Sequence, residues 1–500
     1  MKKISRKNKL IYTTATSVLL QLVSVISGFI LPRLYLTYWG SEVNGLVASI
    51  GQFLGLISFL DLGVGQVVQS CLYSPLANEE FHDVSMVLSS GMIFFRKLAL
   101  IFLIYTGGLA IAYPLFINSN FGYWYVASLI IILSIDSFAQ YYFGIAYQML
   151  LNSDQKGYIP NFVQCITIVL NVSLSVVFLR LGFSLHAVKL TTSIVFLLRP
   201  FLMWLYIKRC YPSVCFNVKY EKDPIKQKWD GFAQHVANVV LTNTDVVVLT
   251  LFSTLTNVSI YSVYNMVVIG VKRLLMSFTN GVQAVFGDLW ARKDIEKLKD
   301  FFYDSEWTIH TLTTIAFGCT ASLIIPFVEV YTLGINDANY IIPSFGLLIT
   351  AAHALHCYRL PYNMMTISSG HFRQTQICYI GASLINIIVS VITVWKYGLI
   401  GVAVGTLVAM AFQTIWLAIY LKNHLFKMDL SNFIKQILVD AGTILICFFF
   451  TNVFVLKEKT YFSWFVLAVE KGIVWTLGSC IINCLIYPKR VKSFINRFRK

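Results

Sequence analysis

The stretch LIGVAVGTLVAMAFQTIWLAIYL, residues 399–421, contains no charged side chain. A helix needs about 20 predominantly apolar residues to cross the hydrocarbon core of a bilayer, so this stretch is long enough for one span. Its apolar residues form continuous runs and do not alternate with polar ones, which favours a helix over a strand of a lipid-facing barrel. The stretch therefore predicts a transmembrane helix.

Similar apolar runs fill most of the 500 residues. The chain is 57% hydrophobic and 12% charged, whereas about a quarter of the residues of a soluble domain are charged. We therefore expect an all-α integral membrane protein with about fourteen transmembrane helices. The predicted spans are residues 10–31, 43–68, 86–116, 123–151, 159–180, 184–207, 231–254, 258–285, 305–333, 340–366, 377–395, 399–421, 433–455 and 464–487.

The distribution of lysine and arginine predicts the orientation of these spans. With the N-terminus inside, 26 of the 39 Lys and Arg residues fall on the cytoplasmic side and five on the opposite side. Because positively charged loops are retained in the cytoplasm, we expect both termini to be cytoplasmic. The run 10–31 is too long for the core of a signal peptide, so we expect it to remain as the first span. The net charge of +16 then reflects topology and requires no nucleic-acid partner.

A polar segment divides the chain into two similar halves. Beyond residues 208–230 the pattern of spans restarts, and the second span of each half ends in a glycine-containing stretch, FLDLGVGQVV (59–68) or FTNGVQAVFGDL (278–289). Internal symmetry of this kind is typical of two-lobed secondary transporters. We therefore expect two pseudo-symmetric six-helix lobes around a central cavity, followed by two further helices. The predicted parts are an N-lobe (1–207), a cytoplasmic linker (208–230), a C-lobe (231–421) and a C-terminal region (422–500).

Charged residues inside the predicted spans indicate function, because an ionisable group in hydrocarbon costs several kcal/mol unless it meets a partner or a wet cavity. The basic residues that we expect to line a cationic, substrate-binding cavity are Arg96, Lys97, Arg199, Lys272, Arg273 and Arg359. For Arg96 and Lys97, extension of the side chain to the membrane interface remains an alternative. The acidic residues are Asp61, Asp136 and Asp245, which either bind a coupling proton or sodium ion or neutralise nearby basic groups.

Two histidines complete the set of candidate residues. His353 and His356 are three residues apart and therefore share a helix face, which Arg359 continues. No carboxylate lies in the same span, and two imidazoles alone make a poor metal site. We therefore expect a polar stripe along the cavity, with no metal ion and no cofactor beyond a proton or sodium gradient.

Motifs of catalysis are missing from the sequence. It contains no P-loop, no H-E-x-x-H and no G-x-S-x-G, and it offers no soluble domain large enough to bind a nucleotide. We expect a protein that is not an enzyme. A membrane-embedded polysaccharide polymerase remains an alternative of a different class, which the short exterior loops disfavour.

Four segments together carry a resemblance to a known family. They are DLGVGQVVQSCLYSPLANEE (61–80), LLNSDQKGYIP (150–160), NTDVVVLTLF (243–252) and YSVYNMVVIGVKRLLMSFTNGVQAVFGDL (261–289). In this order the chain resembles the Wzx-type polysaccharide flippases of the multidrug/oligosaccharidyl-lipid/polysaccharide (MOP) exporter superfamily. Gln69 and Ser70 depart from the pattern, since similar flippases have a basic residue there.

The resemblance implies a function and a location. It implies alternating access that moves an undecaprenyl-pyrophosphate-linked oligosaccharide from the inner to the outer leaflet of a bacterial plasma membrane, for capsule, exopolysaccharide or O-antigen synthesis. Membrane lipid, a polysaccharide polymerase and an initiating glycosyltransferase are the partners that it implies. Basic side chains suit the pyrophosphate of such a substrate, since guanidinium groups hold phosphate oxygens bidentately. A lipid II flippase and a cation-coupled drug exporter of the same superfamily remain alternatives, although a drug exporter favours an acidic cavity.

Overall fold

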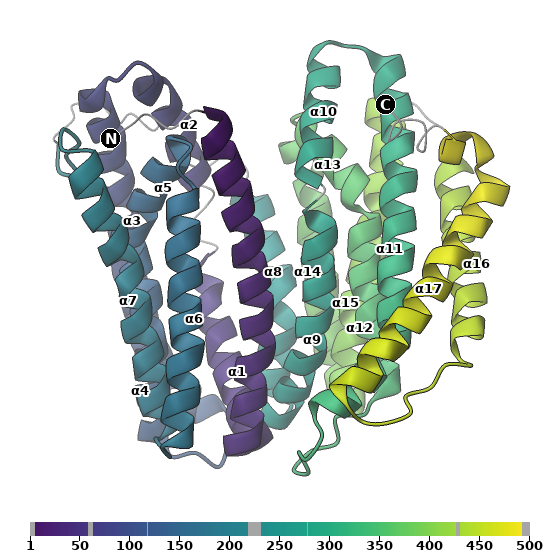
Figure 1. The fold of residues 1–500 in the computed structure, drawn as a ribbon, viewed down its shortest axis with the longest axis horizontal. Coiled ribbons are helices and arrows are strands. Elements are labelled where there is room, and N and C mark those ends of the chain that lie inside the picture. The colour runs from purple at the N-terminus through teal and green to yellow at the C-terminus, as the bar shows by residue number, and fades with distance from the viewer. Residues whose placement is uncertain are drawn as a thin grey trace. The chain divides into compact units, whose positions relative to one another are not determined.

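The computed structural model describes residues 6–58, 64–117, 119–218, 232–277, 279–426 and 431–492, and these residues form helices and no strand (Figure 1). The chain divides into two compact units, residues 1–239 and 240–500. The first half comprises α1 (Arg6–Leu56), α2 (Val64–Ala77), α3 (Phe81–Phe116), α4 (Tyr123–Ala139), the π-helical turn η2 (Gln140–Gly144), α5 (Ile145–Ser153), α6 (Tyr158–Arg180) and α7 (Leu185–Cys210). The division between the units falls within α8 (Phe232–Phe252).

The second half continues with helices of similar length. They are α9 (Leu255–Met276), α10 (Thr279–Ala291), α11 (Ile295–Tyr331), α12 (Pro343–Tyr358), α13 (Leu360–Ser368), α14 (Phe372–Tyr397), α15 (Leu399–Tyr420), the π-helical segment η3 (Leu421–Phe426), α16 (Ser431–Thr451) and α17 (Tyr461–Ile486). Eleven helices of the described chain are long and apolar enough to cross a membrane, and residues 236–252 form a shorter apolar helix. The protein is therefore an all-α, multi-pass membrane protein.

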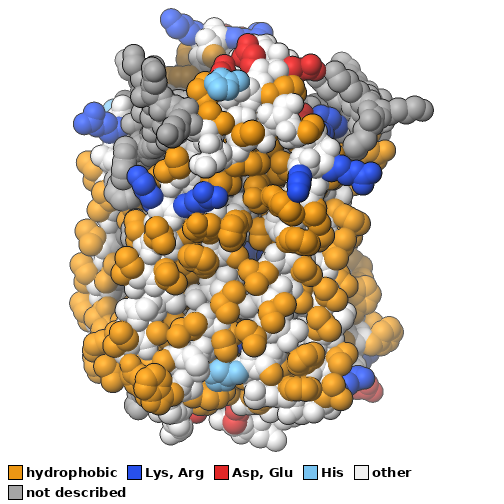
Figure 2. Space-filling model, turned by 90° about the vertical axis from the view of Figure 1, so that its left-hand side faces the viewer, with side chains coloured by type: hydrophobic (Ala, Val, Ile, Leu, Met, Phe, Trp, Pro, Cys, Tyr) orange, Lys and Arg blue, Asp and Glu red, His pale blue; other side chains and the backbone are white. Residues whose placement is uncertain are grey.

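The surface of the protein agrees with a lipid environment. On the face drawn in Figure 2, hydrophobic side chains form a broad band, and lysine and arginine gather mainly along one end of it. Large apolar side chains such as Ile104, Leu115 and Trp124 are exposed by 76%, 69% and 81%. Exposure of this extent is costly in water and favourable in hydrocarbon, so we interpret the band as the lipid-facing surface.

The structure divides two predicted spans and confirms one predicted turn. The predicted turn between residues 31 and 43 is confirmed, because non-helical backbone at Gly40, whose φ of 81° suits glycine, divides α1 into two helical segments. The predicted span 258–285 is divided between α9 and α10, and the predicted span 340–366 between α12 and α13. Apolar composition continues through these breaks, so hydropathy alone does not reveal them.

The two units share one internal pattern of packing. In the first unit α2 packs on α3 and α5, α3 on α4, α4 on α7, and α6 on α7. In the second unit α10 packs on α11 and α13, α11 on α12, α12 on α15, and α14 on α15. The broken helix α12–α13 thus corresponds to α4, η2 and α5, whose π-helical turn also interrupts a span. This correspondence is the internal pseudo-symmetry that the sequence predicts.

Helices α16 and α17 pack on α11 and on each other, outside the repeated pattern (Figure 1). Pro326 lies inside α11 and has no amide proton, so the carbonyl of Ser322, four residues earlier, loses its helical donor. The Lys471 ammonium of α17 donates to that carbonyl at 3.0 Å, and the Trp475 indole donates to the Ser322 hydroxyl at 2.9 Å. Gly318 admits the indole, since a Cβ there would lie 2.2 Å from the Trp475 ring.

Candidate functional site

Four basic side chains gather inside the second unit, and we call Lys272, His353, His356 and Arg359 the cationic cluster. Lys272 lies near the C-terminal end of α9, the two histidines lie on α12, and Arg359 joins α12 to α13. The charge of Lys272 acts on both histidines and on Arg359. The structure therefore brings together four of the predicted cavity residues.

Arg359 is the most buried member of the cationic cluster, with 2% of its surface exposed. Its Nη2 donates to Nδ1 of His356 at 2.9 Å, and its Nη1 lies 3.8 Å from Sδ of Met410. Because a guanidinium group only donates, His356 accepts through Nδ1 and is neutral in this contact. The Nε of Arg359 is buried without a hydrogen-bond partner.

The cationic cluster lacks compensating negative charge. Within the part of the chain that the structure describes, neither Lys272 nor Arg359 forms an ion pair. An uncompensated buried charge is costly, so such a site favours the binding of an anion. A phosphate group would supply several oxygens to the guanidinium and ammonium groups.

Other predicted cavity residues lie apart from this cluster. Arg273 follows Lys272 along α9 but is exposed. In the first unit, Arg96 of α3 is half-buried with its guanidinium 5.1 Å from the ring centroid of Tyr142 in η2, and its Nε has no partner. The neighbouring Lys97 is exposed. Only Lys272 of the predicted pair Lys272–Arg273 therefore belongs to the cationic cluster.

Arg199 of α7 has an environment unlike that of Arg359. Its Nε donates to the Thr167 hydroxyl of α6 at 2.9 Å, and its guanidinium lies 3.7 Å from the centre of the Phe196 ring. The charges of Arg199 and Asp136 of α4 attract each other. Asp136 is therefore placed to neutralise Arg199, which is the structural alternative that the sequence left open for this aspartate.

Asp245 of α8 is held by neutral donors from three other helices, and only 5% of its surface is exposed. It accepts hydrogen bonds from the hydroxyls of Tyr261 on α9 at 2.8 Å and of Thr406 on α15 at 2.7 Å. The Asn386 amide of α14 donates to it at 3.4 Å. Unlike Asp136, this carboxyl group has no basic partner among the described residues.

Neutral polar residues around Asp245 were missed by the sequence analysis. Ser390 donates to Oδ1 of Asn386 at 2.9 Å and approaches the Val402 carbonyl at 3.5 Å. Asn386, Ser390 and Thr406 are polar residues inside apolar runs, and this placement could have identified them as candidates for the site.

Asp61, the third predicted acidic residue, lies outside the described residues.

Two cavities adjoin each other between α16 and α17, with volumes of about 650 and 570 Å³. Ile446 and Ile482 line both of them. Their walls are almost entirely apolar, apart from Ser431, Lys435 and Thr443 in the first cavity. We call the two cavities together the α16–α17 groove. Such a surface suits a long hydrocarbon chain.

Comparisons with solved structures identify the fold. The lipid II flippase MurJ in an inward closed conformation matches 96% of this chain and 100% of its own, with a TM-score of 0.71 at 17% identity. A multidrug resistance MATE family transporter of the MOP superfamily matches 81% of this chain and 94% of its own, with a TM-score of 0.62 at 16% identity. The chain has the fold of a MOP-superfamily transporter.

A third solved structure carries the same fold. A MOP superfamily transporter from Pyrococcus furiosus, described as having a binding pocket of reverse polarity, matches 84% of this chain and 96% of its own. Its TM-score is 0.58 at 13% identity. No protein-family model and no curated protein sequence matches this chain.

Proposed function

We propose that this protein is a flippase that moves an undecaprenyl-pyrophosphate-linked oligosaccharide across the plasma membrane by alternating access. The observation that carries the proposal is the cationic cluster, in which Lys272 and Arg359 have no acidic partner among the described residues. A pyrophosphate diester carries two negative charges, so it can neutralise both side chains at once. The same charges repel a cationic drug, which disfavours the drug exporter.

The α16–α17 groove supports a substrate with a long apolar tail. It runs between the two helices that lie outside the repeated pattern, and it has room for several isoprene units. MurJ matches 96% of this chain, whereas the MATE family transporter matches 81%. A polysaccharide polymerase and an initiating glycosyltransferase would be the functional partners of such a flippase.

We propose further that Asp245 binds the coupling proton or sodium ion. The oxygens of its carboxylate, of Thr406 and of the Asn386–Ser390–Val402 group lie close together, and such hard oxygen ligands suit a small cation. The test replaces Asp61, Asp136 and Asp245 singly by asparagine. We expect Asp245→Asn to abolish the dependence of transport on the ion gradient, and an unchanged dependence in this variant would refute the assignment.

The function is tested by complementation of a polymer-deficient flippase deletion strain. Wild type should restore surface polymer, and Lys272→Ala/Arg359→Gln should fail at equal membrane abundance. The control is Lys297→Ala, because Lys297 is exposed and pairs with Asp294 on the surface. Failure of the wild type in every host with a matching repeat unit would contradict the proposal.

A second candidate substrate is lipid II, because the MurJ match covers nearly the whole of this chain. Lipid II shares the polyprenyl pyrophosphate and differs in its sugars and peptide. Complementation of a strain depleted of its lipid II flippase separates the two. Rescue of that strain, without rescue of the polymer-deficient strain, would assign the protein to lipid II.

A further inference from the structure

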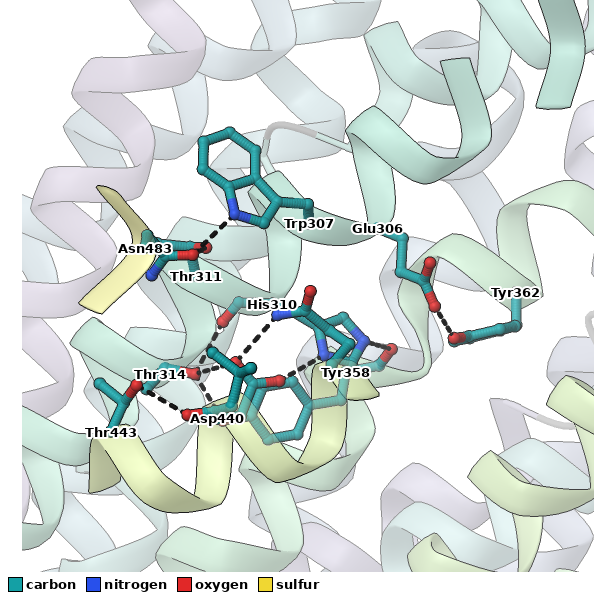
Figure 3. A network of polar contacts seen from close by, with 12 residues as sticks. Glu306, Trp307, His310, Thr311, Thr314, Tyr358, Tyr362, Asp440, Thr443 and Asn483 are labelled. Carbon is teal, nitrogen blue, oxygen red and sulfur yellow. Dashed lines mark hydrogen bonds and ion pairs between the residues drawn. The ribbon is translucent and has the colours of Figure 1, made fainter. Parts of the chain in front are cut away.

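Three buried ionisable residues of the second unit lie outside the cationic cluster and the Asp245 site (Figure 3). Glu306 and His310 are one turn apart on α11, and Asp440 lies on α16. Their exposed fractions are 3%, 0% and 5%. The sequence analysis did not single them out, although they lie within the predicted spans 305–333 and 433–455. A cluster of this kind inside a membrane protein points to function.

The contacts of the His310 ring show how many protons the cluster holds. Nδ1 lies 2.7 Å from Oδ2 of Asp440, and Nε2 lies 3.2 Å from the carbonyl oxygen of Tyr358 (Figure 3). A carbonyl oxygen only accepts, so Nε2 carries a proton. The contact with Asp440 needs a second proton, on either Nδ1 or the carboxyl group. The His310–Asp440 pair therefore holds two protons in total. Neutral His310 beside ionised Asp440 would hold only one.

The remaining contacts hold the carboxyl groups in place. Oδ1 of Asp440 accepts from the Thr314 hydroxyl at 3.0 Å and from the Gln436 amide at 3.2 Å. Glu306 accepts a hydrogen bond from the Tyr362 hydroxyl and also attracts His310. The other titratable or charged groups that act on the cluster or on its tyrosines are Tyr303 on α11, Cys357 and Tyr358 on α12, and Tyr487 and Arg490 after α17.

The same contacts fix the junction between α12 and α13. Tyr358 is the last residue of α12, and its carbonyl is held by His310 while its hydroxyl is bonded to Thr314 at 2.9 Å. Tyr362 belongs to α13 and is held by Glu306. Arg359 of the cationic cluster lies between these two tyrosines. Both sides of the junction are thus tied to α11, and α11 is tied to α16 through Asp440.

We propose that Glu306, His310 and Asp440 form a proton-binding site, and that release of the proton shared by His310 and Asp440 frees the α12–α13 junction. Without this proton, only one ring nitrogen of His310 carries a hydrogen, so a lone pair faces either the Asp440 carboxylate at 2.7 Å or the Tyr358 carbonyl at 3.2 Å, and the facing groups repel each other. Either loss breaks the series of contacts that joins Asp440, His310 and Tyr358, while the Thr314 hydroxyl still links α11 to Asp440. The site stands independently of the substrate, whereas its link to transport rests on the proposed function.

The test is hydrogen–deuterium exchange of full-length protein in lipid nanodiscs, at pH 6 and pH 10, corrected for intrinsic exchange. Exchange of residues 355–368 is compared with that of α6, which belongs to the other unit. We expect it to increase at least about 10-fold at pH 10 in the wild type, because a broken buried pair destabilises its surroundings by several kcal/mol. Equal corrected exchange at both pH values would overturn the proposal.

Two variants test whether the pH-dependent exchange arises from His310 and Asp440. His310→Gln keeps a polar side chain but binds no titratable proton, so exchange should be rapid at both pH values, and Asp440→Asn should behave likewise. His82→Gln is the matched control, because His82 is exposed at the start of α3. It should retain the wild-type pH step. A pH step that persists in both His310→Gln and Asp440→Asn would also overturn the proposal.

The link to transport has its own measurement. In proteoliposomes containing the lipid-linked substrate, His310→Gln should flatten the pH dependence of flipping, whereas His82→Gln should leave it as in the wild type. An unchanged pH dependence in His310→Gln overturns the link. Wild type that moves no substrate refutes the proposed function instead, and the exchange measurement still tests the proton site.

Discussion

Both units use the same helix packing, yet several cations of the two units differ in their partners. In the first unit the charge of Asp136 attracts Arg199, and Lys9 and Lys156 both pair with Asp154. In the second unit Lys272 and Arg359 lie near two histidines, and within the described residues they form no ion pair. Shared architecture therefore does not require shared electrostatics.

This difference separates two roles for charges in a membrane protein. A cation that has an acidic partner is satisfied by the protein itself and contributes to folding. A cation without such a partner stores unfavourable free energy that an anionic ligand releases on binding. Under the proposed function, the paired residues of the first unit serve structure and the cationic cluster of the second unit binds the substrate headgroup.

The largest expected effect is on the flipping rate, and it tests whether the cations of the two units have different roles. Lys272→Met/Arg359→Gln should reduce flipping about 100-fold or more, because each charge-assisted hydrogen bond to phosphate contributes about 1.5–3 kcal/mol. The charge-neutral double variant Asp136→Asn/Arg199→Gln should reduce it less than about 5-fold, because it removes an internally compensated pair. Flipping rates in proteoliposomes, normalised to inserted protein, provide the comparison. Equal losses in both variants would remove the distinction between the units.

The next effect concerns the helices that only the second half possesses. Gly318→Val should lower the free energy of unfolding by about 3 kcal/mol, because the added side chain collides with Trp475 and forces α17 away from α11. Gly472→Ala is the control, since no atom lies within 4 Å of the Cβ that it would add. Thermal unfolding in detergent distinguishes them. A Gly318→Val protein as stable as the wild type would show that α17 does not pack as described.

A smaller effect on stability distinguishes Asp136 of the first unit from Asp245 of the second. Asp136→Asn should cost about 2 kcal/mol of stability, because Arg199 loses its counter-charge. Asp245→Asn should change stability by less than about 1 kcal/mol, because all its partners are neutral and an amide oxygen can still accept their hydrogen bonds. Chemical unfolding of both variants at pH 7 measures the difference. The reverse order would contradict the roles assigned to these carboxyl groups.

The smallest effect is a pH dependence in the first unit. Burial by itself raises the pKa of Asp154, but hydrogen bonds from Lys156 and Tyr211 and the charges of Lys156 and Lys9 outweigh it and hold the pKa below its usual value. The ion pairs therefore stabilise the folded state above the ordinary pKa of an aspartate, and this stabilisation is lost as the pH falls through the lower folded value.

We expect Asp154→Asn to be less stable than the wild type by about 1 kcal/mol at pH 6, since the group is partly exposed. The gap should narrow on acidification to about pH 3, below the ordinary aspartate pKa. Thermal unfolding at the two pH values measures it. A gap that widened on acidification would have the wrong sign for a carboxyl group with a lowered pKa.

Much of the fold could be predicted from the sequence, because bilayer thickness fixes the length of an apolar run that becomes a helix. The break at Gly40 falls in the turn that hydropathy predicts, but the α9–α10 break and the α12–α13 junction at Arg359 could not be predicted, since the chain remains apolar on both sides of them. The charged candidate residues could be recognised in the sequence, because they lie inside apolar spans. Their partners could not, because Asp136 meets Arg199 across 63 positions and Asp245 meets Thr406 across 161 positions of the chain.

The most direct test of the central claim measures binding of undecaprenyl pyrophosphate and of uncharged undecaprenol to the purified protein, for example by native mass spectrometry. The wild type should prefer the pyrophosphate by at least about 10-fold, which corresponds to 1.4 kcal/mol. Arg359→Gln should lose most of that preference, and Asp136→Asn/Arg199→Gln should keep it. Equal binding of the two lipids by the wild type, or loss of the preference only in the first-unit variant, would contradict a headgroup site at the cationic cluster.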